Sequence, residues 1–215
     1  MASNDDQDRH WLQPTKPITR GAFIVIEGLD RAGKTTQVKT LADELYSSGR
    51  NVKTIRFPAK GYTIICDRYY YSGIVYSAAK QNQALSLAWA HEPEVGLPRP
   101  DLVVFLDLDS EEAEKRGGYG DEKYEKKEMQ KRVRELFLDL PLLGTDESLD
   151  MLVINAGGSI KEVAKEIKEK VFTKVEEVEE GKLGDELRVV RAWHDGVLDK
   201  LDEKKRGKEL NDRSL

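Results

Sequence analysis

Residues 22–48 read AFIVIEGLDRAGKTTQVKTLADELYSS, and the architecture of the whole chain can be worked out from this stretch. Its first six residues form a mostly apolar run, which predicts a strand buried on both faces of a parallel sheet. From about Lys34 to Ser48, apolar side chains recur at helical spacing, and Gly49 is a stop signal. We therefore predict a strand, a tight glycine-containing loop and a helix.

The loop between them carries the pattern G-x-x-x-x-G-K-[ST], from Gly28 to Thr35, in the strand-to-helix context that a phosphate-binding loop requires. Glycines let backbone N–H groups turn inward around a phosphate chain, and the helix N-terminus adds a partial positive charge. Lys34 is expected to reach the β- and γ-phosphates, and Thr35 to hold Mg²⁺. The motif predicts a nucleotide site.

The motif alone does not identify the reaction. A GTPase needs a guanine-reading N-K-x-D element, which does not occur in the sequence. Asp30 and Arg31 lie inside the loop, where a carboxylate and a guanidinium beside the γ-phosphate can position an acceptor and neutralise developing charge. These two residues favour phosphoryl transfer to a second substrate.

Outward from this loop, strand and helix patterns alternate along the chain. The alternation predicts a doubly wound α/β fold, a parallel five-stranded sheet with helices on both faces. Strand patterns follow at 52–57, 62–66, 102–106 and around 152–154, and helical patterns at 71–80, 85–91, 110–116, 123–140 and 160–175.

Composition favours one enzyme-sized domain. The 215 residues suffice for a single α/β core, and the net charge of −5 argues against a general nucleic-acid or membrane-surface binder. We predict a flexible leader at 1–20, a domain at 21–187 and a charged tail at 188–215. The sequence from residue 176 onward is interpreted as a loose helical or disordered segment, with a solvated surface segment as its structural interpretation. No run of about 20 apolar residues suggests a membrane span, and the start resembles no targeting peptide. A cytoplasmic protein is expected, with the nucleus left open.

The stretch 51–70, NVKTIRFPAKGYTIICDRYY, poses a geometric problem. Only residues 58–61 separate the strand patterns 52–57 and 62–66, whereas adjacent parallel strands need a crossover of roughly a dozen residues or more. We therefore expect the first of these strands either to change its pairing or to be lost from the sheet.

Five blocks, in order, resemble thymidylate kinases of the eukaryotic type, which carry Arg in the phosphate loop. They are FIVIEGLDRAGKTT at 23–36, RFP at 56–58, ICDRYYYSGIVYSAAK at 65–80, PEVGLPRPDLVVFLDL at 93–108 and KRGGYGDEKYE at 115–125. The resemblance implies a P-loop nucleoside-monophosphate kinase fold with a mobile lid. It also implies ATP-dependent conversion of dTMP to dTDP, with ATP and dTMP as partners, Mg²⁺ as cofactor and a homodimer as the assembly.

The resemblance further implies roles for individual residues. Asp30 would orient the acceptor, Arg31 would bridge donor and acceptor phosphates, and Arg68 would clamp the acceptor phosphate. Asp67 would support Mg²⁺ with Thr35. The implied catalytic residues are Asp30, Arg31, Lys34 and Arg68, and the implied ATP-binding residues are Gly28, Gly33, Lys34, Thr35, Thr36 and Arg116. The implied acceptor-binding residues are Asp30, Arg56, Phe57, Arg68, Ser72, Gly73, Tyr76 and Tyr124. Tyr124 and the lid around Lys123 would close over both substrates.

Several of these residues also have structural interpretations. Arg56 could be a surface charge at a strand end, and Arg68 could simply pair with a neighbouring carboxylate. Tyr76 could pack in the core, and Lys123 and Tyr124 could open a solvated helix. Cys66 is interpreted as a structural buried thiol. A surface position is expected for all three histidines, His10, His91 and His194.

Thymidylate kinases normally insert a few dozen residues between the RFP element and the GYTIICDRY strand, and this chain resembles a form without them. The inserted segment carries an aromatic residue and an arginine that read the thymine, each worth about 1 to 3 kcal/mol by analogy with base recognition elsewhere. Their loss is expected to weaken dTMP binding about a hundredfold or more and to leave a marginally stable product. A catalytically dead nucleotide-binding isoform and a kinase with relaxed base choice are the alternatives.

Overall fold

A computed structural model describes residues 20–53, 62–80, 86–109, 112–113, 123–194, 196–197 and 200. Within them, one parallel sheet has the strand order β2-β3-β1-β4-β5. Four strands are β1 (Phe23–Gly28), β3 (Thr63–Asp67), β4 (Leu102–Asp107) and β5 (Met151–Asn155). The described part of β2 is Val52–Lys53, and it is followed directly by residues outside the described part. The predicted α/β class with a parallel five-stranded sheet is confirmed.

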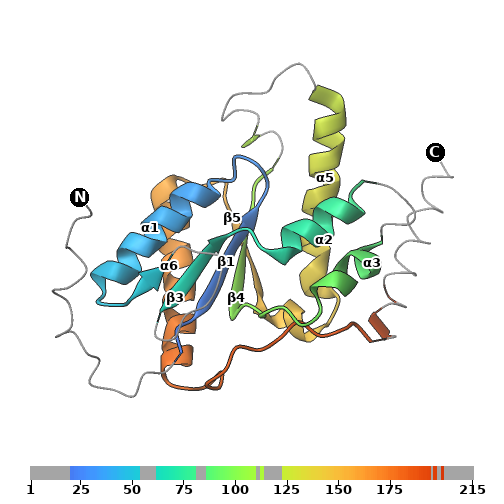
Figure 1. Ribbon diagram of the computed structural model, residues 1–215. Helices are drawn as coiled ribbons and strands as arrows, with labels where there is room; N and C mark the ends of the chain where they lie inside the picture. Colours follow the sequence, from blue (N-terminus) through green and yellow to red (C-terminus); the bar gives the residue numbers. More distant parts are fainter. Residues whose placement is uncertain are drawn as a thin grey trace, which may run out of the picture.

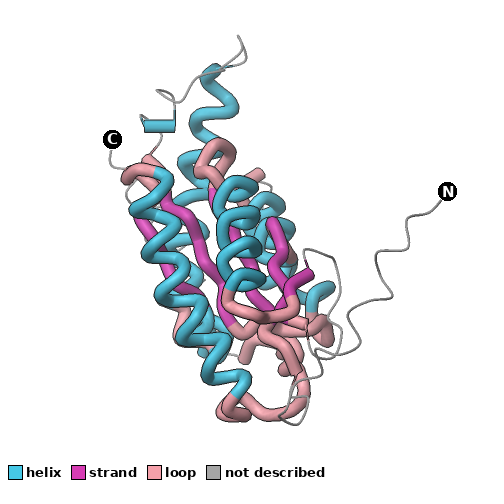
Figure 2. Tube along the Cα trace, turned by 90° about the vertical axis from the view of Figure 1, so that its left-hand side faces the viewer, coloured by secondary structure: helices cyan, strands magenta, loops and turns pink. Residues whose placement is uncertain are grey.

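Helices cover both faces of this sheet, because neighbouring residues of a strand point to opposite sides. Ile24 and Ile26 of β1 pack in a core with α1 (Lys34–Ser47) and α6 (Ile160–Glu179), whereas Phe23 and Val25 pack on the other side. That second core includes α2 (Tyr70–Ala78), α3 (Leu87–His91) and α5 (Lys123–Asp139). Figure 1 shows the two groups of helices on either side of the sheet, and Figure 2 looks onto the face that α1 and α6 cover.

Short 3-10 turns complete the described elements: η1 (Glu92–Glu94), η2 (Leu140–Leu142) and η3 (Asp146–Asp150). The helix predicted at 110–116 falls mostly outside the described residues. Two residues that belong to the apolar patterns of the predicted helices are exposed. They are Tyr46, whose side chain lies about 100° around the helix from the buried Leu45, and Ile160, the first residue of α6.

The region of the short linker differs from both expectations. Val52 pairs with Thr63, and Lys53 with Ile64, in a parallel arrangement, so this strand neither changes its pairing nor leaves the sheet. The remaining residues of the predicted strand, 54–57, lie outside the described part.

The segment from residue 176 is helical at its start, as one of the predicted alternatives had it, but as far as residue 194 it is packed rather than loose or disordered. Helix α6 continues to Glu179, and residues 187–194 run along the amino ends of the strands, below the sheet in Figure 1. The amide of Arg99 donates to the carbonyl oxygen of Arg188 at 2.7 Å, and Val190 pairs with Leu97 and is buried. The backbone hydrogen bonds and the burial of Val190 therefore stabilise the packed segment, although the charged side chains around it remain solvated. The division at 187/188 stays a prediction.

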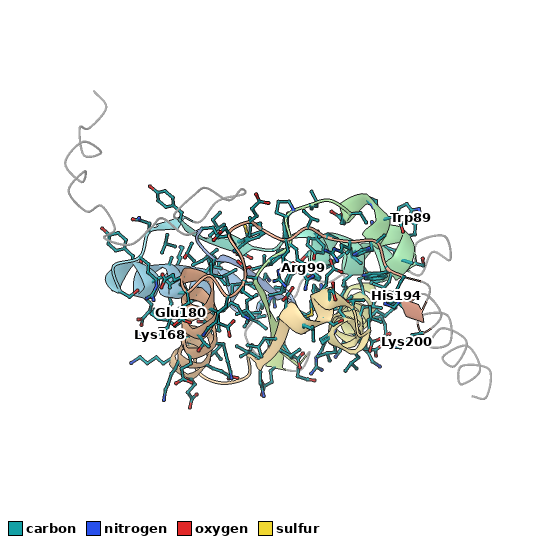
Figure 3. All side chains as sticks on the ribbon, turned by 90° about the horizontal axis from the view of Figure 1, so that it is seen from below. Trp89, Arg99, Lys168, Glu180, His194 and Lys200 are labelled. Carbon is teal, nitrogen blue, oxygen red and sulfur yellow. The ribbon has the colours of Figure 1, made fainter. Side chains whose placement is uncertain are left out.

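Ion pairs hold this edge of the molecule. Arg99 donates to Asp150 at 2.6 Å, and Arg188 donates to the other oxygen of the same carboxylate at 3.1 Å. Figure 3, viewed from below, places Arg99 at the centre of this face and Trp89 at its rim. No helix of the described residues is long and apolar enough to span a membrane.

Candidate active site

The phosphate-binding loop connects the carboxyl end of β1 to the N-terminus of α1, as predicted. Gly28 has φ 153°, and an added Cβ would lie 2.9 Å from the carbonyl oxygen of Leu106. Gly33 caps α1 in a left-handed conformation with φ 89°, which glycine adopts without steric cost. The two glycines thus serve different needs, a close backbone approach in one case and a positive φ in the other.

Lys34 lies at the start of α1 with its side chain buried against the loop. Its Nζ donates to the carbonyl oxygen of Leu29 at 2.8 Å. Burial lowers the pKa of this ammonium, and the positive charge of Arg68 lowers it further, while Asp30 and Asp67 act in the opposite direction. The loop therefore holds a cation whose hydration is poor and which a phosphate chain would stabilise.

The two residues predicted to support Mg²⁺ are in contact. The hydroxyl of Thr35 donates to Oδ2 of Asp67 at 2.8 Å, which brings the start of α1 against the end of β3. Mg²⁺ prefers such hard oxygen ligands and takes only one or two from the protein when it also binds substrate phosphates. The described residues hold no group of three or more His, Cys, Asp or Glu side chains suited to a metal, and a site of this kind does not need one. The two oxygens fit Mg²⁺.

Arg68 and Asp30, predicted in separate motifs, form an ion pair. Arg68 Nη2 donates to Asp30 Oδ1 at 2.6 Å, and the Asp30 side chain is 68% exposed. The same guanidinium lies over the ring of Tyr76, 5.7 Å from its centroid. Arg68 therefore does pair with a carboxylate, as its structural interpretation had it. Because that carboxylate is Asp30 of the phosphate loop, the ion pair is also part of the candidate site.

Two arginines of the site, Arg31 and Arg68, have left-handed backbones, with φ 69° and φ 70°. Such a conformation is uncommon outside glycine and persists where surrounding contacts enforce it. For Arg68, the amide donates to the carbonyl oxygen of Ile26 at 3.0 Å. The strain at these positions coincides with the residues predicted to bind phosphates.

Glu27 is a residue of this site that the sequence interpretation missed. It lies in β1 with no exposed surface, and its carboxylate accepts hydrogen bonds from Tyr69 and Ser72. Burial raises the pKa of Glu27, against the hydrogen bonds from Ser72 and Tyr69. The available signal was a carboxylate within an otherwise apolar strand, directly before the phosphate loop, because buried charges are rare unless paired.

The remaining predicted residues divide into three groups. Ser72 and Tyr76 lie beside Arg68, and Ser72 Oγ is 3.5 Å from Arg68 Nη1. Thr36 and Gly73 are exposed near the same edge, with Thr36 in the first turn of α1 and Gly73 in α2. Outside the described residues or side chains lie Arg56, Phe57, Arg116 and Tyr124.

The surface position expected for His91 is wrong. His91 is 1% exposed, stacks on Trp193 with ring centroids 4.1 Å apart, and lies 3.1 Å from Oε2 of Glu147. Tyr70 and Trp193 also donate to Glu147. Because both Glu147 and Trp193 are far from His91 in sequence, no local pattern around the histidine could have indicated this buried cluster.

Comparisons with known proteins agree with this geometry. The family model "Thymidylate kinase" matches residues 53–167. A thymidylate kinase from Arabidopsis thaliana is 36% identical over 207 aligned positions that cover 76% of this chain and 75% of that protein. One from Danio rerio is 35% identical over 211 positions that cover 76% and 97%.

A solved structure gives the same result at the level of the fold. The thymidylate kinase from Candida albicans matches 80% of this chain and 99% of its own, with a TM-score of 0.62 and 29% sequence identity. The agreement in fold extends well beyond the phosphate loop.

Proposed function

This chain belongs to the thymidylate kinase family, and we propose on that premise that it transfers the γ-phosphate of ATP to dTMP, giving dTDP and ADP. The observation that carries the proposal is the Arg68–Asp30 ion pair of 2.6 Å. It connects the end of β3, where the acceptor phosphate is expected, to the loop that holds the donor phosphates. One guanidinium and one carboxylate therefore stand between the two expected phosphate positions.

The side chains divide the work of phosphoryl transfer, which needs alignment and cations more than covalent chemistry. Lys34 holds the β- and γ-phosphates and exchanges its bond to Leu29 for them. Arg31 balances charge between donor and acceptor. Arg68 clamps the acceptor phosphate, and Asp30 orients the acceptor. Mg²⁺, held by Thr35 and Asp67, would neutralise charge on the transferring phosphate.

The base-reading half of the acceptor pocket is proposed to be missing. The alignment with the Danio rerio relative has 211 positions, close to the full 215 residues of this chain, yet it covers 76% of the chain. Within the matched region, the relative therefore has residues that align with no residue of this chain. A gap between Pro58 and Gly61 accounts for them, since the blocks on both sides are intact. Weak dTMP binding follows, with the transfer chemistry retained.

A coupled ADP-release assay tests the proposal on dTMP, dUMP, dCMP, dAMP and dGMP. We expect turnover on dTMP at high concentrations, lost in Lys34→Ala and retained in Lys39→Ala, which removes an exposed lysine from the same helix. ATP binding without transfer to any monophosphate would contradict the proposal and indicate a catalytically dead nucleotide-binding isoform. Equal turnover on several bases would indicate relaxed base choice.

We also propose the homodimer that the family resemblance implies. Trp89 of α3 and Val95, four residues after the end of that helix, have exposed apolar side chains on the described surface. Exposed apolar side chains are consistent with a surface that a second copy of the chain covers. Light scattering coupled to size exclusion measures the assembly directly, and a mass of one chain at micromolar concentration would contradict it.

A further inference from the structure

Glu27 lies one residue before the phosphate loop, yet its side chain points away from solvent. It has 0% exposure, and both carboxylate oxygens accept hydrogen bonds. Oε1 accepts from the backbone amides of Tyr69 at 2.9 Å and Ser72 at 3.3 Å, and Oε2 accepts from the Ser72 hydroxyl at 2.6 Å. A carboxylate so enclosed is not placed to touch a substrate.

The groups that Glu27 holds surround Arg68. Tyr69 is the N-cap residue of α2, and its amide is one of those that a helix N-terminus leaves without a partner in the helix. Ser72 belongs to the first turn, and its amide is shared between the Glu27 carboxylate and the carbonyl oxygen of Tyr69. The amide of Arg68 itself donates to the carbonyl oxygen of Ile26, the neighbour of Glu27 in β1. Ile26 and Glu27 of β1 thus accept hydrogen bonds from Arg68 and Tyr69, the two residues of the turn between β3 and α2.

This support matters because Arg68 has φ 70°, a conformation that a chain outside glycine keeps only under external constraint. Ser72 adds a link to the side chain. Its hydroxyl is bound to Glu27 Oε2 at 2.6 Å and lies 3.5 Å from Arg68 Nη1. The carboxylate therefore reaches both the backbone of the turn and the guanidinium.

We propose that Glu27 is a positioning residue for the acceptor-phosphate clamp, holding Arg68 in its left-handed conformation through the amides of Tyr69 and Ser72 and through the Ser72 hydroxyl. The inference rests on the proposed function for the identity of the ligand, dTMP. Glu27 acts through Arg68 and makes no contact with either nucleotide.

Calorimetric titration of the full chain with dTMP and, separately, with ATP tests this role. Glu27→Ala removes the acceptor of the Tyr69 amide and of the Ser72 hydroxyl, while the Ser72 amide keeps the carbonyl oxygen of Tyr69 at 3.2 Å. The change is expected to weaken dTMP binding at least about tenfold, while ATP affinity stays within about twofold. Glu27→Gln keeps one carbonyl acceptor and an amide that can donate to Ser72, so it should restore most of the dTMP affinity. A merely structural loss of folded protein would lower the number of sites in both titrations and leave both dissociation constants unchanged.

Ser72→Ala and the double variant Glu27→Ala/Ser72→Ala complete the test. If both residues act along one path to Arg68, the double variant should bind dTMP about as weakly as Glu27→Ala alone. Equal weakening of ATP and dTMP binding, or unchanged dTMP affinity in Glu27→Ala, would overturn the inference.

The inference remains testable if the wild-type chain binds no dTMP, which would count against the proposed function alone. Hydrogen exchange of the ATP-bound protein then measures the turn itself. We expect the Tyr69 and Ser72 amides to exchange at least about tenfold faster in Glu27→Ala and the amides within α1 to be unchanged. Unchanged exchange at Tyr69 and Ser72 would overturn the positioning role.

Discussion

Arg68 connects the separate motifs of the candidate site, since its side chain reaches Asp30, Ser72 and the ring of Tyr76. Its place in the candidate site could be predicted from the resemblance of the D-R-Y block, and its role stays a proposal. Its pairing with Asp30 could not be predicted, because that contact spans 38 residues of sequence. Its left-handed backbone was equally hidden, since no local pattern of residue types marks a strained non-glycine position. Motifs located the site, and tertiary contacts determine its geometry.

Cys66 is a second residue whose chemistry depends on its surroundings. Burial, followed by the charge of Glu27, raises the pKa of its thiol to about 11. Because the thiolate is the nucleophile, we expect alkylation by iodoacetamide near neutral pH to be about a hundredfold slower than in the unfolded chain, rising as the pH approaches the pKa. Cys66 is the only cysteine, so mass spectrometry reports it alone. Equal rates in folded and unfolded protein would contradict the assignment.

Glu147 gives a pH-dependent prediction. Burial would raise its pKa, but hydrogen bonds from His91 and Trp193 outweigh burial and hold the pKa below 4.5. A carboxyl with a lowered folded pKa stabilises the protein above its unfolded pKa and loses that contribution as the pH falls through the folded value. Glu147→Gln should therefore lower the free energy of unfolding by about 1 to 3 kcal/mol near neutral pH.

Urea denaturation at about pH 7 and about pH 3 measures this difference. We expect the gap between wild type and Glu147→Gln to shrink at the lower pH, while Glu128→Gln, at an exposed position of α5, shows little effect at either. A gap that grows on acidification would contradict the ionised, hydrogen-bonded Glu147.

At the scale of elements, periodic segments could be predicted and irregular ones could not. The strands at 102–106 and 152–154 and the helix from Lys34 appear within one or two residues, since each buries a face that repeats along the sequence. The helix from Ile160 begins as predicted and continues four residues beyond the predicted end, to Glu179. Residues 187–194 carry no such repeat. They are held by bonds to 96–99 and by Arg188, which depend on distant residues. Charge content alone was a misleading guide to that segment.

The packed C-terminal segment should contribute measurably to stability. Trp193 is partly buried, stacks on His91 and donates to Glu147 at 3.1 Å. Trp193→Ala is expected to lower the free energy of unfolding by about 2 to 4 kcal/mol, because packing is lost and Glu147 loses a donor. Leu149→Ala is the control, since Leu149 is 86% exposed and its truncation should cost at most about 0.5 kcal/mol. Similar costs for both variants would contradict the packing of residues 187–194.

At the scale of the whole molecule, the described residues bring the phosphate loop, Lys34 and the Thr35–Asp67 contact together at the carboxyl ends of β1 and β3. The loss of part of the acceptor site between β2 and β3 stays a proposal. The expected marginal stability of the product stays a prediction, as does the division into leader, domain and tail.

The dTMP concentration dependence of ADP release tests this account most directly. It should be compared between this chain and a form that carries, after Pro58, the corresponding segment of the Arabidopsis thaliana relative. We predict that both forms phosphorylate dTMP, that KM for ATP agrees within about threefold, and that KM for dTMP is about a hundredfold higher in this chain. An equal KM for dTMP in the two forms, or no dTMP-dependent ADP release from this chain at any concentration, would contradict the account.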